Sequence, residues 1–341
     1  MPENVRSYVI LSIVAALVAV AAMLWFTAGG TPPHPAVQSA TVSSPPHARS
    51  IFKLRPVGAW STLPGDATCA GRVRRSTWEP RPDNAVPNAT MPDVPAVHAA
   101  FAARPVAVQG AYDERWDTWL LPRVTGHFRG TTDEVFQWAA CKWGLNDNLL
   151  RAMAVRESSW YQYLAYPSGR CTFNYGCGDE FLQPSKATRV YCAALARFGH
   201  DYRQDYAANG GICPKTFGIL GVMSWRNPQW GARKDNQNGT FPFNRNSTAF
   251  VADYVGSQLR GCYEGWEWWL RNTGSGHYAA GRLWGCVGAW YAGDWWGKDA
   301  TGYVDRVRAE WSAHPWLAED WPRVKPPCDA TYGCPGGGNT Q

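Results

Sequence analysis

The sequence lacks the short motifs that commonly bind metal ions. Its ten cysteines contain no C-x-x-C pair and its seven histidines contain no H-x-x-x-H pair. These are spacings that zinc sites typically use. No internal repeat is visible either. We therefore expect neither a metal site nor a cofactor.

Long runs of one charge are also missing. No run of Lys and Arg exceeds two residues, and the net charge is only +6. Nucleic-acid-binding proteins usually gather basic residues on one face or helix, so this scattered pattern argues against a nucleic-acid partner. A mild positive charge suits association with an anionic matrix such as a cell wall or a membrane face.

Charged residues are absent from Tyr8 to Ala28. This stretch is long enough to span a bilayer, which takes roughly 20 residues. Arg6 precedes it and no Lys or Arg follows before Arg49, so the positive-inside rule places the N-terminus in the cytoplasm. We expect a single-pass membrane anchor at residues 1–28, with membrane contact through residues 8–28 and an extracytoplasmic domain on the periplasmic or cell-wall side. A removed signal peptide and a buried core helix are the alternatives.

Cysteine and tryptophan, by contrast, are plentiful. An even number of cysteines in an exported chain favours a disulfide framework. The close pairs Cys171/Cys177 and Cys328/Cys334 could each close a small loop. The 20 tryptophans are expected mostly in the core, with a few free to stack on sugar rings in a cleft.

Composition divides the rest of the chain into four parts. Residues 29–50 form a Pro/Ser-rich linker. Residues 51–130 are rich in Pro and Arg with little periodicity, so we expect irregular chain that packs on the main domain and could meet an envelope protein partner. The main domain covers residues 131–325, and residues 326–341 form a flexible tail.

Helical periodicity dominates the main domain, so the expected fold class is mostly α. A capping box at Thr131–Glu134 predicts a helix that Gly144 stops, and a second helix begins near Asn146. Strand signals are few, and residues 165–215 look loop-like. Further helices are predicted from Ser247 onward, at 278–292 with Gly293 as the stop, and at 301–313.

Glu157 interrupts the apolar stripe of the second helix. At helical spacing it is flanked only by apolar or aromatic residues: Leu150, Met153, Ala154, Trp160, Tyr161 and Leu164. Burial among them would raise the pKa of this carboxyl toward the working pH, as a general acid requires. The alternative is a buried Glu paired with an Arg, or a Glu at the edge of the stripe that reaches water.

Four short motifs, in order, give the chain a family resemblance. They are the A-x-A-x-x-E-S pattern at 152–158, the glycine-rich turn at 218–224, the Ala-Trp-Tyr-Ala-Gly segment at 289–293 and the Thr-Gly-Tyr-Val helix start at 301–304. Together they resemble the lysozyme-like lytic transglycosylases of the soluble type. The resemblance covers roughly residues 131–313.

The resemblance implies a lysozyme-like α+β domain that cleaves the MurNAc–GlcNAc bond of peptidoglycan and leaves a 1,6-anhydro-MurNAc end. Glu157 would be the sole general acid/base, and Tyr303 would reach towards it. Peptidoglycan glycan strands would be the partner. The implied substrate-binding residues are Ser158, Gly218, Gly221, Val222, Met223, Ser224, Trp290, Tyr291 and Tyr303, with the turn at 218–224 forming one wall of the sugar cleft through exposed backbone.

Other functions remain open at this stage. The family's Gln is Ser224 here and its Asn is Tyr291, which favours a non-catalytic peptidoglycan-binding scaffold of the cell envelope. A hydrolysing muramidase or chitinase is the other alternative, and it would need a second carboxylate facing Glu157. Asp179, Glu180, Asp235 and Asp294 are expected to be solvated loop acids instead.

Overall fold

The computed structural model describes residues 49–103, 111–162, 216–224 and 238–324, all within one compact unit. The expected anchor, most of the linker, the loop at 165–215, its cysteines and the tail lie outside these residues. In the part of the chain that is described, no helix has the length and apolar character needed to cross a bilayer.

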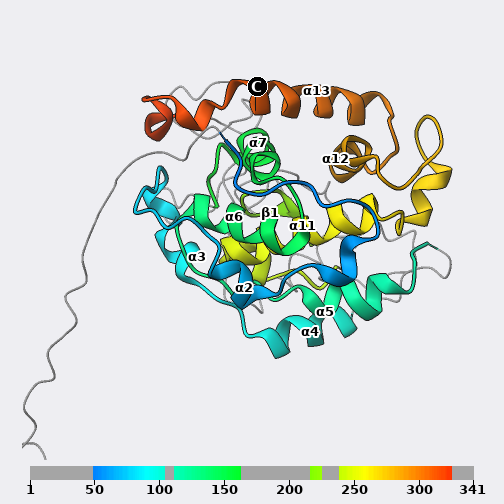
Figure 1. Cartoon of the computed structure of the whole chain (residues 1–341), viewed down its shortest axis with the longest axis horizontal. Coiled ribbons are helices and arrows are strands. Elements are labelled where there is room, and N and C mark those ends of the chain that lie inside the picture. Colours follow the sequence, from blue (N-terminus) through cyan, green and yellow to red (C-terminus); the bar gives the residue numbers. More distant parts are fainter. Residues whose placement is uncertain (1–48, 104–110, 163–215, 225–237, 325–341) are drawn as a thin grey trace, which may run out of the picture. The chain divides into compact units, whose positions relative to one another are not determined.

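The described residues are mostly helical, as predicted (Figure 1). The core helices are α6 (Thr132–Trp143), α7 (Asp147–Ser158), α11 (Thr248–Tyr263), α12 (Leu283–Ala292) and α13 (Lys298–Ala313). α6 packs on α7 and α11, and α13 packs on α7 and α12. The strands described are β1 (Thr216–Phe217) and β2 (Val222–Met223), which pair antiparallel.

Local sequence signals set most of the core helix ends. The Thr131/Glu134 capping box is present, and Gly144 ends α6 in the left-handed conformation. The Asn146 side chain caps α7 and Ser247 caps α11, each by accepting a backbone N–H. The predictions of these three starts and of the stop at Gly144 are confirmed.

Two predicted helices differ in their starts. The 278–292 helix begins only at Leu283, because Gly281 has a φ of 79° and breaks any helix before it. The 301–313 helix begins earlier, at Lys298, after Gly297. Gly293 ends α12 in the left-handed conformation, as expected.

The prediction of irregular chain at 51–130 is partly wrong. This segment contains short helices, which pack on the main domain as expected and lack the periodicity that a long helix would show. They are α2 (Asp66–Ala70), α3 (Ala85–Ala89), α4 (Val94–Ala103) and α5 (Leu121–Arg123), with short turns of other helix types at Ala59–Thr62, Pro82–Asn84 and Trp116–Leu120.

The remaining described elements complete the chain around the core. α10 (Phe243–Asn246) precedes α11, and single turns follow α11 and α13 at Trp268–Asn272, Pro315–Leu317 and Trp321–Arg323. Phe250, Phe136 and Leu149 are fully buried in the core. None of the described tryptophans is exposed, so the prediction that most belong to the core is confirmed.

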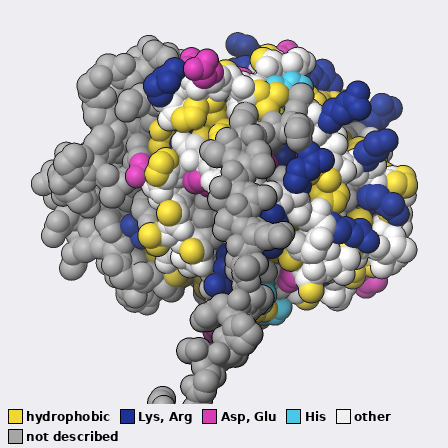
Figure 2. All heavy atoms as spheres, turned by 60° about the vertical axis from the view of Figure 1, so that its left-hand side comes forward, with side chains coloured by type: hydrophobic (Ala, Val, Ile, Leu, Met, Phe, Trp, Pro, Cys, Tyr) yellow, Lys and Arg dark blue, Asp and Glu magenta, His cyan; other side chains and the backbone are white. Residues whose placement is uncertain are grey.

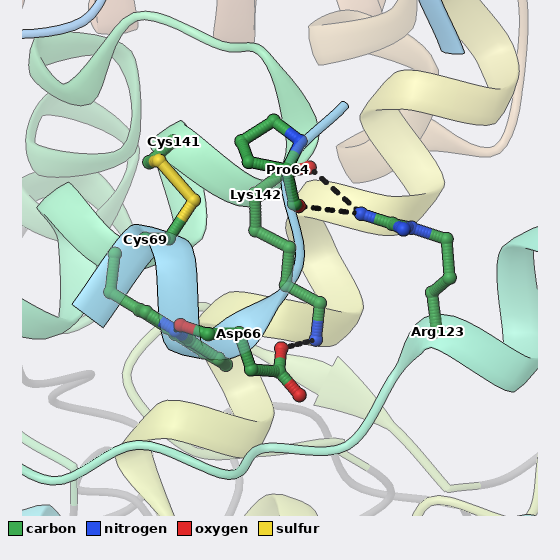
Figure 3. The surroundings of a disulfide bond; sticks show 7 residues. Pro64, Asp66, Cys69, Arg123, Cys141 and Lys142 are labelled. Carbon is green, nitrogen blue, oxygen red and sulfur yellow. Dashed lines mark hydrogen bonds and ion pairs between the residues drawn. A yellow bond between two sulfur atoms is a disulfide. The ribbon is translucent and has the colours of Figure 1, made fainter. Parts of the chain in front are cut away.

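Two disulfides are present among the described residues. Cys262–Cys286 joins α11 to α12, and Cys69–Cys141 joins α2 to α6 (Figure 3). Beside the latter, Lys142 Nζ lies 2.5 Å from Asp66 Oδ1, while the Arg123 guanidinium donates to the Pro64 carbonyl at 2.8 Å.

A buried ion pair joins α6 to α11, and it shares Lys142 with the ion pair beside the Cys69–Cys141 disulfide. Lys142 Nζ lies 2.8 Å from Asp253 Oδ2, and both side chains are almost inaccessible to water. Asp253 also accepts from Trp143 Nε1 at 2.7 Å and from the backbone of Thr125 and Gly126. We call Asp253, Lys142, Trp143, Asp66 and Thr125 the Asp253 cluster. Every carboxylate charge in it has hydrogen-bond or ionic partners, as burial requires.

Candidate functional site

Glu157 lies in the last turn of α7, where the helix ends sooner than the apolar stripe suggests. Ser159 and Trp160 have φ values of 50° and 68°, so the chain leaves the helix after Ser158. Trp160 turns back and its indole donates to the Arg151 carbonyl at 2.9 Å. Trp160 and Tyr161 therefore do not continue the helical stripe.

This early end leaves Glu157 half-buried, whereas the stripe predicted burial. Leu150, Met153 and Ala154, one and two turns earlier, are fully buried as expected. The side chain of Glu157 thus stands where the buried face of α7 meets the surface. A carboxyl group in this position can reach both a protein partner and a bound molecule.

Tyr303 of α13 is the protein partner that the sequence pointed to. Its side chain is buried and its hydroxyl donates a hydrogen bond to Glu157 Oε1. The two residues are 146 positions apart. Packing of α13 on α7 brings them together, and an ion pair of 3.4 Å between Arg156 and Glu310 joins the same helices.

Tyr291 of α12 extends this pair toward the surface. Its ring stacks on the Tyr303 ring with centroids 4.4 Å apart and planes 1° from parallel. Tyr291 is also 50% exposed, so it offers an aromatic surface beside the Glu157–Tyr303 pair. The neighbouring Trp290, in contrast, is half-buried and packs against the core.

Ser158 connects α7 to the hairpin of β1 and β2. Its hydroxyl is buried and donates to the Ile219 carbonyl at 2.9 Å. Ser158 therefore holds the turn of the hairpin beside the end of α7 that carries Glu157. This is a positioning role, and it leaves the hydroxyl occupied, which argues against direct substrate contact.

The hairpin turn itself is less open than predicted. Gly218 has a φ of 84° and is buried, and a Cβ there would come within 2.6 Å of the Asn244 carbonyl oxygen. It is a close-packing glycine, and the prediction of exposed backbone at this position is wrong. Gly221, with a φ of 61°, is half-buried at the end of the turn.

The last strand of the hairpin alternates between core and surface. Val222 and Ser224 are fully buried, and the Ser224 hydroxyl accepts from the Asn244 amide at 2.9 Å. Met223 points the other way and is 38% exposed. Of these three predicted cleft residues, only Met223 is available to a bound molecule; Ser224 and Val222 belong to the core.

Gln162 is a residue that the sequence did not reveal. It is fully buried, accepts from the Ile219 backbone N–H at 3.0 Å and donates to the Asn244 carbonyl at 2.9 Å. It therefore fixes the same residue of the hairpin turn that Ser158 contacts. No motif surrounds it, so only the tertiary structure identifies it.

Glu267 is a second acid that the sequence did not single out. It is largely buried between α11 and the turn at Trp268–Asn272, and burial raises the pKa of its carboxyl to about 8. Tyr278 accepts from the Glu267 backbone N–H and donates to the Cys262 carbonyl at 2.8 Å. The chemical condition expected of Glu157, a desolvated carboxyl, is therefore met at Glu267.

The described residues bring together no group of three or more His, Cys, Asp or Glu side chains that could hold a metal ion. Asp294, predicted to be a solvated loop acid, is half-buried instead and lies against Gly297 at the start of α13. Asp179, Glu180 and Asp235 lie outside the described residues.

Comparison with known proteins found no family model, no curated protein and no solved structure that matches the chain.

Proposed function

We propose that this protein is a peptidoglycan lytic transglycosylase in which Glu157 is the sole general acid/base. The hydrogen bond from Tyr303 to Glu157 carries the proposal. It joins two of the segments that resemble the family, which lie 146 residues apart in the sequence. A phenol held on a half-exposed carboxyl is a suitable arrangement for an acid that must give up a proton and take it back.

The proposed reaction needs one carboxyl group. Glu157 protonates the glycosidic oxygen as the bond from that oxygen to C1 of the muramyl sugar breaks. The muramyl C6 hydroxyl oxygen then bonds to C1, and its proton returns to Glu157. The products are a free GlcNAc hydroxyl and a 1,6-anhydro ring, and no water is consumed. A hydrolase would instead need a second carboxylate to activate water.

The remaining groups would hold the substrate. Tyr291 and Met223 are the exposed apolar side chains on the elements around Glu157, and an aromatic ring suits stacking on a sugar. We further propose that the domain is extracytoplasmic and tethered by residues 8–28, which would place it near peptidoglycan.

Isotope labelling of the products tests the reaction type. Purified peptidoglycan is digested in water enriched in ¹⁸O, and the released fragments are weighed by mass spectrometry. Transglycosylation gives anhydro ends without ¹⁸O, whereas hydrolysis gives reducing ends that carry it. Labelled reducing ends would replace the proposal with a muramidase or chitinase.

A non-catalytic peptidoglycan-binding scaffold is the second candidate, and the residues at positions 224 and 291 favour it. Ser224 is buried and Tyr291 is aromatic, so neither position offers the amide group that the family has there. Binding of glycan strands by the wild-type protein without release of any soluble fragment would support this scaffold.

A further inference from the structure

The segment at 50–76 covers one side of α6 and runs opposite to it. Three bonds to α6 and its C-terminal glycine show this direction, because they come in the reverse order along α6. They are the hydrogen bond from Arg55 N to the Gly144 carbonyl at 2.8 Å, the Cys69–Cys141 disulfide, and the hydrogen bond from Ser76 N to Glu134 Oε1 at 2.7 Å. In Figure 1 this blue segment, which includes α2, lies beside α6.

The acids of this region are turned inward. Asp66 pairs with Lys142, and Glu79 accepts from the Thr132 backbone N–H at 2.7 Å. Glu134 is only 3% exposed and completes the capping box of α6. Their negative charges therefore serve the interior and contribute little to the surface.

The cations of the same region point outward. We call them the basic face: Lys53, Arg55, Arg72, Arg74, Arg75 and Arg129, all of them exposed. Arg75 pairs with Glu134 at 3.2 Å, and among the described residues no acid pairs with the other five side chains. On the right-hand side of Figure 2, Lys and Arg are numerous and Asp and Glu are few. Folding brings Arg129 to this segment, because the Arg75 guanidinium donates to its carbonyl at 3.5 Å.

Exposed apolar side chains lie among these cations. Leu54 is 36% exposed and Val57 is 43% exposed, and they are two of only five large hydrophobic side chains exposed in the described part of the chain. Both belong to the Lys53–Val57 stretch. A soluble polyanion would use the cations alone, whereas a lipid surface takes up cations at its phosphates and apolar side chains between its headgroups.

We propose that the basic face binds the anionic phospholipid headgroups of a membrane. The proposal does not depend on the enzymatic one. The short distance in sequence between the expected anchor and the basic face supports this proposal, because the face begins directly after the linker at 29–50. The 22 residues from 29 to 50 can span at most about 75 Å, so the expected anchor would keep this face close to the bilayer. The domain would then lie with its basic face against the bilayer.

Chemical footprinting of the full chain in vesicles tests this proposal. The protein is inserted into preformed vesicles of phosphatidylcholine, with or without phosphatidylglycerol, and its arginines are modified with phenylglyoxal and quantified by mass spectrometry. In low salt, Arg55, Arg72 and Arg74 should react about fivefold more slowly on the anionic vesicles, and high salt should abolish the difference. The exposed Arg271 and Arg308 serve as references in the same molecule and should not change.

Apolar substitutions separate a lipid surface from a soluble polyanion. Leu54→Ser with Val57→Ser should reduce the protection on anionic vesicles, whereas Val86→Ser, a change at an exposed residue outside the Lys53–Val57 stretch, should reduce it less. Equal modification on both kinds of vesicle would overturn the proposal. So would equal slowing at the reference arginines. If dextran sulfate protects the face as well as vesicles do and the double variant changes nothing, the partner is a soluble polyanion instead.

Discussion

The Asp253 cluster and the Glu157 site use carboxylates in opposite ways. Asp253 is fully buried, and a lysine, an indole and two backbone N–H groups surround its oxygens. Glu157 is half-buried and accepts a hydrogen bond from the Tyr303 hydroxyl. The exposed ring of Tyr291 stacks on the Tyr303 ring. The more buried of these two carboxylates therefore helps to hold two helices together, whereas the proposed catalytic acid lies at the edge of the core.

The first prediction tests whether Asp253 stabilises the fold and Glu157 does not. Asp253→Ala would remove one of the two ionic partners of the buried Lys142. It would also leave the Trp143 indole and two backbone N–H groups without their acceptor, so we expect a loss of about 3–5 kcal/mol of unfolding free energy. Urea unfolding followed by tryptophan fluorescence measures this loss. Glu157→Gln is the matched control and should leave the unfolding free energy nearly unchanged. If the two substitutions destabilise the protein equally, the contrast between the two regions fails.

The second prediction concerns Glu267, a buried acid outside both regions whose pKa is raised. The pKa of Glu267 is 4.5 when the chain is unfolded and about 8 when it is folded. Between these values the native carboxyl holds a proton that the unfolded one has released, so stability falls as pH rises, by about 1.4 kcal/mol per pH unit. Below pH 4.5 and above pH 8, this contribution is constant.

Glu267→Gln should abolish that pH dependence. Measured by urea unfolding at pH 5 and pH 8, the variant should be more stable than wild type at pH 8 and close to it at pH 5. An unchanged difference between the two pH values would show that Glu267 is charged in the folded protein.

The third prediction concerns the phenol at the Glu157 site. Tyr303→Phe keeps the ring and its stack with Tyr291 but removes the hydrogen bond to Glu157. A hydrogen bond to a charged group contributes about 1.5–3 kcal/mol, so the rate of peptidoglycan solubilisation should fall roughly 10–100-fold. The unfolding free energy should change far less than in Asp253→Ala. A full rate in this variant would remove Tyr303 from the proposed mechanism.

The smallest expected effect is at Tyr291. Tyr291→Ala removes an aromatic pair that contributes about 0.5–1.5 kcal/mol, so solubilisation should slow by roughly 2–10-fold. Tyr291→Phe keeps the stacked ring and should retain the wild-type rate. If both variants behave alike, stacking at this position has no part in activity.

Sequence predicted the parts of the fold that depend on near neighbours. The capping box at Thr131 and Glu134, the caps Asn146 and Ser247, and the glycine stop at Gly144 each act within one helical turn. The end of α7 escaped prediction because Ser159 and Trp160 adopt positive φ without glycine. Tertiary contacts hold them there, including the indole of Trp160 on the Arg151 carbonyl.

The candidate site, too, contains features that were expected from the sequence and features that were not. The contact of Tyr303 with Glu157 was expected from the family resemblance, and the hydrogen bond is present. The burial of Ser224 was not expected, because its partner Asn244 lies 20 residues further on. Glu267 was missed because its surroundings come from separate segments of the chain. The functional roles of these residues stay predictions.

The rate of peptidoglycan solubilisation by Glu157→Gln tests the central claim most directly. Glutamine keeps the size of the side chain and can still accept from Tyr303, but it cannot donate and recover a proton. The account predicts that the folded variant releases soluble fragments at least about 10²-fold more slowly than wild type. Release at the wild-type rate would contradict it and leave Glu157 without a catalytic role.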